Sequence, residues 1–355
     1  MHFSSLRPTG FRNLEDAEIP CPGRDIFLVG ENGQGKTNFL EAVYFCSYGS
    51  SFRGVRDADL IRNGEKNCSV IAKIDDALQE KLLVKIENGK KSVQVDGKAS
   101  DRKELISIVP SIVFCHEDME FVAGTPERRR WFFDQSLSLY DPVYLDDLQK
   151  YRRVLKMRNT VLKDGKASML EVIDPQLVQY GISLMRKRRE AAETFSAAFS
   201  PLYEAVSGID GIKIRYSPSW KEENAEALIP FLEERRQNDL SFGTSLSGPH
   251  RDRYIFSRNG TEFAGKASTG QRRLLALLIR IAQARRYTEM TGKKPILLLD
   301  DVLLELDPEK RRRFFTVMPE YSQSFYTFLP EEPYERYQKE DTVVFHVSDG
   351  KIIQS

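Results

Sequence analysis

The chain has 355 residues, of which 41% are hydrophobic and 30% charged, and 53 Lys and Arg against 52 Asp and Glu give a net charge of +1. This length predicts one large domain or two smaller ones, with enough apolar material for a buried core. No run approaches the 18 or more apolar residues of a membrane-spanning helix, and the N-terminus lacks the features of a signal peptide, so we expect a cytoplasmic protein.

The cysteine pattern argues against a disulfide scaffold and against a zinc site. The chain has four cysteines and four histidines, and no two cysteines have the CxxC spacing of a metal or redox motif. We therefore expect reduced thiols that pack as small hydrophobic side chains.

Apolar patterning predicts α/β structure in the first third of the chain. We expect a buried strand over 25–30, an apolar helix over 39–48, and alternating half-buried strands that Asn88-Gly89 joins into a hairpin. These alternating strands and a further buried strand are predicted over residues 69–75, 81–87, 92–96 and 112–115.

The middle of the chain reads as helical and charged, and α/β character returns after about residue 250. Residues 127–205 have a helical pattern; positions 150–189 carry 11 Lys and Arg against 3 Asp and Glu, whereas 190–240 carry 5 against 10. The last third predicts a hairpin, a helix, a buried strand and a closing hairpin over residues 253–263, 271–290, 295–301 and 342–352.

A complete phosphate-loop motif, GxxxxGK[ST], follows the first buried strand and precedes the first helix, as that motif requires. Its glycines let successive N–H groups point at phosphate oxygens, and the helix N-terminus adds its positive dipole end. We expect Lys36 to reach the β- and γ-phosphates of a nucleotide and Thr37 to bind Mg²⁺. The motif comprises Gly30, Glu31, Asn32, Gly33, Gln34, Gly35, Lys36 and Thr37.

Two carboxylates follow the aliphatic run Ile296 to Leu299. A buried strand that ends in Asp at the edge of a sheet is what phosphate-loop enzymes use to hold Mg²⁺. Asp300 is the candidate metal ligand, and Asp301 is the candidate group that orients or polarises the attacking water.

A third motif lies in the chain between the phosphate loop and the Asp300-Asp301 pair, and together the three motifs resemble a known family. Ser268, Gly270 and Gln271 form an S-x-G-Q pattern before a helix, and Ser268 alone also suits a helix N-cap. The order of phosphate loop, S-x-G-Q and Asp-Asp strand resembles the ATP-binding-cassette ATPases, and Glu305-Leu306-Asp307 is similar to their D-loop. The resemblance implies that the Ser268 turn of a second copy contacts the γ-phosphate.

Finer matches resemble the RecF family of bacterial recombination-mediator ATPases over nearly the whole chain. They lie in Phe11 to Leu14, Ser51 to Arg53, Glu117-Asp118, the GPHRD stretch at 248–252 and the VSDGKI stretch at 347–352. The resemblance implies an α/β cassette-type head, lobe I, from residues 1–125 and 241–355, and an inserted helical lobe II from 126–240. It also places Arg12 near the nucleotide, although a solvated surface Arg fits the sequence equally well.

The chain departs from the family pattern at three places. His116 stands where Pro is usual, Arg253 stands where a second acid usually follows GPHRD, and Lys266-Ala267 precede the S-x-G-Q turn. The switch histidine of cassette ATPases has no clear counterpart, and the resemblance implies Thr327 in its place. We expect His250 and Arg251 to be supporting or interface groups only.

Basic clusters on the expected helices are candidates for DNA contact. Positive helix faces attract phosphate backbones without reading sequence, whereas the plainer interpretation is a solvated helix face. No helix-turn-helix or zinc finger is present in the sequence, so specific base recognition is not expected. The candidate DNA contacts are Arg128, Arg129, Arg152, Arg153 and Lys156.

The combined interpretation is a DNA replication and repair ATPase that binds ATP and Mg²⁺, dimerises on ATP and binds gapped or junction DNA. Resemblance further implies work with RecR and RecO, support of RecA loading and the SOS response, and weak DNA-stimulated hydrolysis. A soluble ATP-binding subunit of a membrane transporter is the alternative from another class. A nucleotide-dependent clamp with negligible turnover is a third, because Asp301 is one methylene shorter than the Glu usual in the wider family.

Overall fold

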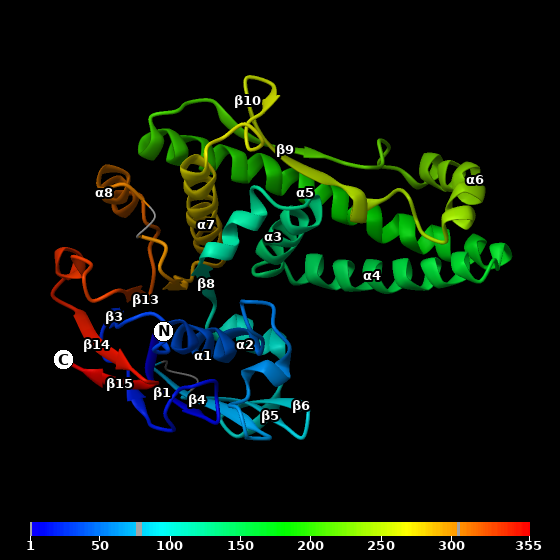
Figure 1. Ribbon diagram of the computed structural model, residues 1–355. Coiled ribbons are helices and arrows are strands. Elements are labelled where there is room, and N and C mark those ends of the chain that lie inside the picture. Colours follow the sequence, from blue (N-terminus) through cyan, green and yellow to red (C-terminus); the bar gives the residue numbers. More distant parts are fainter. Residues whose placement is uncertain (1, 76–79, 304–305) are drawn as a thin grey trace. The chain divides into compact units, whose positions relative to one another are not determined.

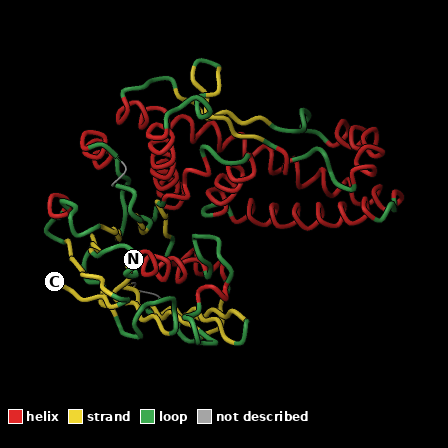
Figure 2. The backbone as a smooth tube through the Cα atoms, in the orientation of Figure 1, coloured by secondary structure: helices red, strands yellow, loops and turns green. Residues whose placement is uncertain are grey.

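The computed structural model describes residues 2–75, 80–303 and 306–355, which divide into two compact units (Figures 1 and 2). The first unit comprises residues 1–117 and 287–355, and the second comprises Asp118–Arg286. The α/β fold expected from the sequence is confirmed. Within the described ranges, every helix falls short of the length and apolarity that a membrane span requires.

The first unit contains two six-stranded sheets. One is antiparallel, in the order β2-β1-β4-β5-β6-β7. Its strands are β1 (His2–Thr9), β2 (Ile19–Pro20), β4 (Cys68–Asp75), β5 (Lys81–Glu87), β6 (Lys90–Val95) and β7 (Lys98–Ser100). Asn88 and Gly89 both have positive φ, at 50° and 71°, which fits the two-residue turn that the sequence predicts between β5 and β6.

The second sheet is mainly parallel and carries the predicted phosphate-loop strand at its interior, in the order β15-β14-β3-β13-β12-β8. Its strands are β3 (Asp25–Val29), β8 (Ser111–Phe114), β12 (Ile296–Leu299), β13 (Gln323–Phe328), β14 (Thr342–Ser348) and β15 (Lys351–Gln354). Strands β3, β8, β12 and β13 are buried along their whole length. Buried parallel strands commonly read as continuous apolar runs, which is why the sequence reveals β3, β8 and β12, whereas β13 mixes polar and aromatic residues.

Helix α1 (Lys36–Tyr48) contacts strands of both sheets, namely β4 and β5 of the first and β13 of the second. Its residues from Phe39 to Tyr48 are all buried. A helix that is apolar all round belongs in a core rather than on a surface. The buried amide of Gln323 also joins the sheets, because its side chain bonds Phe3 N (2.9 Å) and Phe3 O (3.0 Å). Two further α-helices of the described residues, α2 (Arg102–Ile108) and α8 (Pro308–Thr316), lie wholly in this unit.

The second unit is helical and contains one small sheet, in the order β11-β10-β9. Its helices are α3 (Pro126–Ser138), α4 (Pro142–Lys163), α5 (Leu170–Ser207) and α6 (Ala225–Phe242), and its strands are β9 (Ile212–Ser217), β10 (Arg253–Arg258) and β11 (Thr261–Glu262). Helix α7 (Thr269–Thr291) belongs to this unit up to Arg286. The long α4 and α5 pack against each other, and β9 packs on α5.

The boundary of the helical unit differs from the sequence expectation of 126–240. Strand β10 pairs with β9 over six residue pairs, from Arg253 with Ser217 to Arg258 with Ile212. Buried Arg188 of α5 also pairs with Asp252, at 2.9 Å. These long-range contacts include residues 241–286 in the helical unit, and the Ser268 turn lies in it.

Candidate nucleotide-binding site

The phosphate loop is built by glycines at positions where a side chain would clash with neighbouring backbone or strain the main chain. A Cβ on Gly30 would lie 2.3 Å from the backbone oxygen of Val347. Gly33 and Gly35 have φ of 79° and 116°, in the region that favours glycine. This backbone turns directly into the N-terminus of α1, so the loop has the curvature and the helix dipole of an anion-binding nest.

Lys36 is the first residue of α1 and is 4% exposed. Its ammonium donates to the backbone oxygens of Gly30 (2.6 Å) and Glu31 (3.1 Å), so it folds back over the loop. These bonds hold the charge at the loop and give a buried lysine the acceptors that it needs.

Thr37 and Asp300 are far apart in the sequence and meet beyond the carboxyl ends of strands β3 and β12 of the second sheet. The Thr37 hydroxyl donates to Asp300 Oδ1 at 2.8 Å. Burial raises the pKa of the Asp300 carboxyl to about 6; the bond from Thr37 opposes the rise, and the neighbouring Asp301 carboxylate reinforces it. A hydroxyl and a carboxylate are the hard oxygen ligands that Mg²⁺ prefers.

Thr327 and Asp301 complete this edge. Thr327 lies near the end of β13, between the phosphate-loop strand and the acidic strand, and its hydroxyl is 2.8 Å from Asp301 Oδ1 and 3.3 Å from Asp300 Oδ1. The same oxygen accepts from Asp301 N at 2.8 Å. Asp301 has φ of 50°, an uncommon value for a non-glycine residue, so its carboxylate is held in a strained turn.

Glu332 is a residue of this neighbourhood that the sequence reasoning missed. It follows β13, is 6% exposed, and accepts from Leu329 N at 2.7 Å. Burial raises the pKa of Glu332, and the Asp301 carboxylate adds to the rise whereas the Lys36 ammonium opposes it. No motif marks it, because its position depends on how the loop after β13 turns back.

Among the described residues, no group of three or more His, Cys, Asp or Glu is arranged to hold a metal ion. A site with one hydroxyl and one carboxylate fits Mg²⁺, which commonly keeps several waters and takes further oxygens from a substrate phosphate.

The segment that precedes the phosphate loop in the chain is tied to α1. Arg12 has φ of 50° and makes two bonds to Glu41 of α1, from Nε to Oε2 (2.7 Å) and from Nη2 to Oε1 (3.1 Å). Glu41 is fully buried and also accepts from the Ser51 hydroxyl. A bidentate pair of this kind fixes the guanidinium in orientation as well as in place.

The VSDGKI stretch forms the turn of the terminal hairpin, and this turn supports the phosphate loop. The backbone N–H of Gly350 donates to Gln34 O at 2.9 Å, and that of Asp349 donates to Gln34 Oε1 at 2.6 Å. A Cβ on Gly350 would lie 1.9 Å from Asn13 O, so only glycine permits the approach. The hairpin therefore contacts both the phosphate loop and the Arg12 segment.

The Ser268 turn lies in the helical unit and starts α7 with a reciprocal capping box. Gln271 N donates to Ser268 Oγ (3.3 Å), and Ser268 N donates to Gln271 Oε1 (2.8 Å). Ser268 and Gly270 are exposed, and a Cβ on Gly270 would meet no atom within 4 Å. The cap uses the serine oxygen as an acceptor, so its hydroxyl proton can be donated to a ligand.

Part of the predicted D-loop lies outside the described residues, because Glu305 is not among them. Asp307 is described and caps α8, with its Oδ1 accepting from Lys310 N at 2.9 Å.

The candidate DNA contacts fall into two groups. Arg128, Arg152, Arg153 and Lys156 are exposed on α3 and α4. Arg129 instead donates to Tyr254 O at 3.2 Å and lies 3.7 Å from Glu262, with its side chain 13% exposed. This environment argues against Arg129 as a phosphate contact, because its guanidinium anchors α3 to the small sheet.

The GPHRD stretch packs into the helical unit through the buried Pro249 and Asp252, whereas Arg251 is exposed. Arg188 of α5 donates to Pro249 O (2.6 Å) and to Asp252 Oδ2 (2.9 Å). Because a carbonyl only accepts, the 3.0 Å contact of His250 Nε2 with Ser245 O requires a proton on Nε2. The Tyr151 hydroxyl then donates to His250 Nδ1 at 2.8 Å. These bonds assign the stretch a structural role in anchoring α4 and α5.

Comparison with known proteins agrees with this geometry. The family model of the RecF/RecN/SMC N terminal domain matches residues 2–352. The chain is 44% identical over 343 residues to the DNA replication and repair protein RecF of Treponema pallidum (strain Nichols), covering 96% of this chain and 97% of that protein. It is 32% identical over 366 residues to the protein of the same name from Leptospira interrogans serovar Lai, covering 99% of each chain.

Solved structures extend the likeness to the fold. A structure described as the recombination mediator protein RecF-ATP in the RecFOR pathway superposes with a TM-score of 0.88 at 29% identity, covering 99% of this chain and 97% of that one. The RecF-ATPrS structure of the same pathway gives a TM-score of 0.86, also at 29% identity, and covers 99% of this chain and 98% of that one. An Smc head bound to a domain of ScpA, at 16% identity and a TM-score of 0.55 with 100% and 98% covered, shares the fold.

Proposed function

The chain belongs to the RecF/RecN/SMC family and is related to RecF along nearly its whole length, and from this premise we propose that it is a DNA replication and repair protein that binds ATP and Mg²⁺. In this proposal two copies close around ATP, and the dimer binds gapped or junction DNA.

The observation that carries the ATP assignment is the 2.8 Å contact between Thr37 of the phosphate loop and Asp300 of β12. It brings a loop with an anion-binding backbone beside a pair of oxygen ligands for Mg²⁺. Lys36 already lies over the loop, and a triphosphate offers it stronger acceptors than the carbonyls of Gly30 and Glu31. The residues present therefore fit both ATP and Mg²⁺.

Bound Mg²⁺ would neutralise charge on the phosphates, and Thr37 and Asp300 are the residues that would hold it. The Thr327 hydroxyl donates a hydrogen bond to Asp301 Oδ1, and this pair can orient a water for attack on the γ-phosphate. Such catalysis depends mainly on positioning and electrostatics. We expect slow hydrolysis, since the Asp301 side chain is short and committed to Thr327.

We assign Ser268, Gly270 and Gln271 to a second copy's nucleotide. The turn is exposed, and Gly270 leaves room for a ligand to approach closely. The turn forms the N-terminus of α7, so the positive end of the helix dipole lies beside a ligand bound there. Each of these features suits a γ-phosphate supplied by another molecule. Arg12, fixed by Glu41, is assigned to the nucleotide of its own chain.

The partners that we propose follow from the relatives. RecF structures are described as part of the RecFOR pathway, so RecR and RecO are the expected protein partners. Support of RecA loading at gaps and a link to the SOS response are part of the same proposal.

Sedimentation velocity with ATP, ADP or no nucleotide, with and without gapped DNA, tests this function. We expect dimers only with ATP, and DNA that sediments with the dimer. Ser268→Arg should keep ATP binding and lose the dimer, because a bulky cation would fill the contact made by the turn. Thr261→Arg, at an exposed position of β11 in the same unit, is the matched control. Dimers of Ser268→Arg that form as in the wild type would contradict the assignment of the turn.

A further inference from the structure

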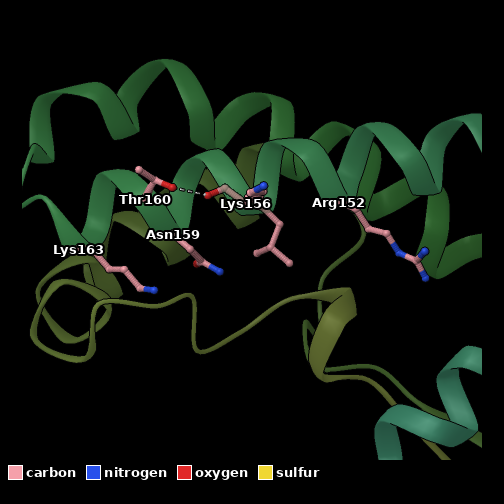
Figure 3. Close-up of a pocket in the computed structure, with 6 residues that line it drawn as sticks. Arg152, Lys156, Asn159, Thr160 and Lys163 are labelled. Carbon is pink, nitrogen blue, oxygen red and sulfur yellow. Dashed lines mark hydrogen bonds between the residues drawn. The ribbon is translucent and has the colours of Figure 1, made fainter. Parts of the chain in front are cut away.

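Two basic grooves lie in the helical unit. The first, here called the α4 groove, has a volume of about 390 Å³. It is lined by Arg152, Leu155, Lys156, Asn159, Thr160 and Lys163. Figure 3 shows Arg152, Asn159 and Lys163 extending from the same side of α4. The second, here called the β10 groove, has a volume of about 550 Å³ and is lined by Ser217, Pro218, Ser219, Lys221, Leu246, Arg251 and Arg253.

One chain segment, residues 244–251, connects the two grooves. Asn159, which lines the α4 groove, accepts from Ser245 N and Ser245 Oγ, both at 2.8 Å. The next residue, Leu246, lines the β10 groove. Arg251 of the β10 groove reaches back to Ser245 O at 3.4 Å. The hydrogen bonds of Ser245 therefore fix the grooves on either side of one ordered segment.

The cations of the grooves are mostly left without acidic partners. Over the ranges that the structure describes, no carboxylate lies within ion-pair distance of Lys156, Lys163, Lys221, Arg251 or Arg253, and Arg152 meets only Asp134, at 3.5 Å. Other lysines of the same unit are compensated: Lys150 pairs with Asp146 at 2.7 Å and Lys166 with Asp164 at 3.1 Å. Uncompensated positive charge gathered in two connected grooves favours an anionic ligand.

The three cations and one asparagine on this face of α4 are spaced to suit an extended anion. Arg152, Lys156, Asn159 and Lys163 follow each other at intervals of three to four residues, so they share a face of the helix. The span from Arg152 to Lys163 is about 16 Å at 1.5 Å per residue, which matches about five base-pair steps of duplex DNA at 3.4 Å per step.

We propose that the α4 groove and the β10 groove form one continuous track for the sugar-phosphate backbone of DNA, with the segment 244–251 between them. The proposal rests on the proposed function and deepens it by naming the surface. Lysine, arginine, serine, threonine and asparagine are the side chains that proteins use for phosphate oxygens, and all five types line the track.

An acidic protein segment is the less favoured occupant. Protein interfaces usually depend on aromatic or large apolar anchors in a desolvated centre. Among the described residues, the apolar ones that line the grooves are Leu155, Pro218 and Leu246, and none that lines them is aromatic. The surface therefore offers charge and hydrogen-bond donors to a polyanion rather than an aromatic anchor to a peptide.

The test measures binding of a fluorescein-labelled gapped duplex, with ATP present, over a series of salt concentrations. Each groove is tested with one double variant. Lys156→Gln with Lys163→Gln removes charge from the α4 groove, and Lys221→Gln with Arg253→Gln removes charge from the β10 groove. We expect each to weaken binding about tenfold at low salt and to lower the slope of log affinity against log salt by about 2, because each phosphate contact contributes close to 1. A fully duplex probe and a single-stranded probe, run in parallel, identify which backbone the track prefers.

The matched control is Lys150→Gln with Lys166→Gln, which removes two paired lysines of the same unit and should leave affinity and salt slope unchanged. The affinity of the same variants for poly-glutamate is also measured, because poly-glutamate represents an acidic protein segment. Groove variants that bind DNA like the wild type, or that lose only poly-glutamate, overturn the track. An effect confined to one groove overturns the continuity of the track. A wild-type dimer that binds none of the DNA probes overturns the proposed function itself.

Discussion

The nucleotide site and the helical unit use charged residues in opposite ways. At the nucleotide site Lys36 is buried and Asp300 is partly buried; among the described residues, the side chain of Lys36 donates to backbone oxygens and that of Asp300 accepts from hydroxyls. In the helical unit, buried charges neutralise each other: Arg158 pairs with Asp174 and Asp239 at 2.7 and 2.6 Å. The comparison teaches that buried Lys36, whose bonds go to backbone oxygens, lies at the proposed ligand site, whereas the compensated Arg158 holds the helices of its unit together.

The same rule divides the basic clusters that the sequence reveals. Arg158 and Arg188 belong to the basic segment 150–189, but both are buried and paired with aspartates. Arg153 and Lys156 remain exposed. Position in a basic cluster therefore says little about DNA contact until the partners of each side chain are known.

The largest effect is expected from breaking the compensated network of the helical unit. Arg188→Leu would leave the carboxylates of Asp134 and Asp252 without their buried partner, and we expect a loss of about 3–5 kcal/mol in the free energy of unfolding. Both tryptophans of the chain, Trp131 and Trp220, lie in this unit, so urea denaturation followed by tryptophan fluorescence measures it.

Arg153→Leu is the matched control, since it removes an exposed arginine from α4 and should change the free energy of unfolding by about 0.5 kcal/mol or less. Equal losses in the two variants would contradict the distinction between compensated and exposed charge.

Lys36→Ala tests the opposite case, a buried charge kept for a ligand. We expect ATP affinity to fall at least about 100-fold, because a charge-assisted contact to phosphate is lost, while the fluorescence-detected unfolding of the helical unit stays unchanged. Titration with a fluorescent ATP analogue measures the affinity. Wild-type affinity in Lys36→Ala would remove Lys36 from the nucleotide site.

His250 predicts a pH dependence that is confined to the helical unit. Burial lowers the pKa of His250 from 6.5 to about 4. Between these values the unfolded chain binds the proton and the folded chain does not, so stability rises with pH from about 4 to 6.5 and is fully present above that window. The contribution is about 3 kcal/mol at most.

Urea midpoints of the tryptophan signal, measured from pH 4 to pH 7, test this expectation. His250→Asn should be less stable at pH 7, since its bonds with Tyr151 and Ser245 are disturbed, and should show a flatter pH profile than the wild type. Parallel profiles of the two proteins would rule out His250 as the titrating group.

The smallest effect is expected at Ser268, where a capping role and a ligand role coincide. Ser268→Ala removes the acceptor for Gln271 N and should cost about 1 kcal/mol, a shift of a few degrees in the melting temperature. ATP-driven dimerisation should weaken far more than stability does. A variant that loses only stability would reduce Ser268 to a helix cap.

Local sequence determined the elements and the motifs. The apolar runs at β3 and β12, the alternation in β4 and β5 and the Asn88-Gly89 turn predict their structures directly, because periodicity and turn chemistry act over a few residues. The sequence likewise predicts the phosphate loop, because its glycines and its lysine lie within eight consecutive positions.

Tertiary structure alone decided which distant residues meet and which charges are neutralised. Three such contacts are Glu332 near Asp301, Gly350 N with Gln34 O, and the Arg129 guanidinium with Tyr254 O of the small sheet. Each depends on chain reversals across tens to hundreds of residues. Among the residues that the structure describes, five of the track's six cations have no carboxylate within ion-pair distance for the same reason: the carboxylates that balance the charge of the sequence lie elsewhere in space. Composition sums charge along the chain, whereas ion pairing depends on distances of a few ångströms that only the folded backbone sets.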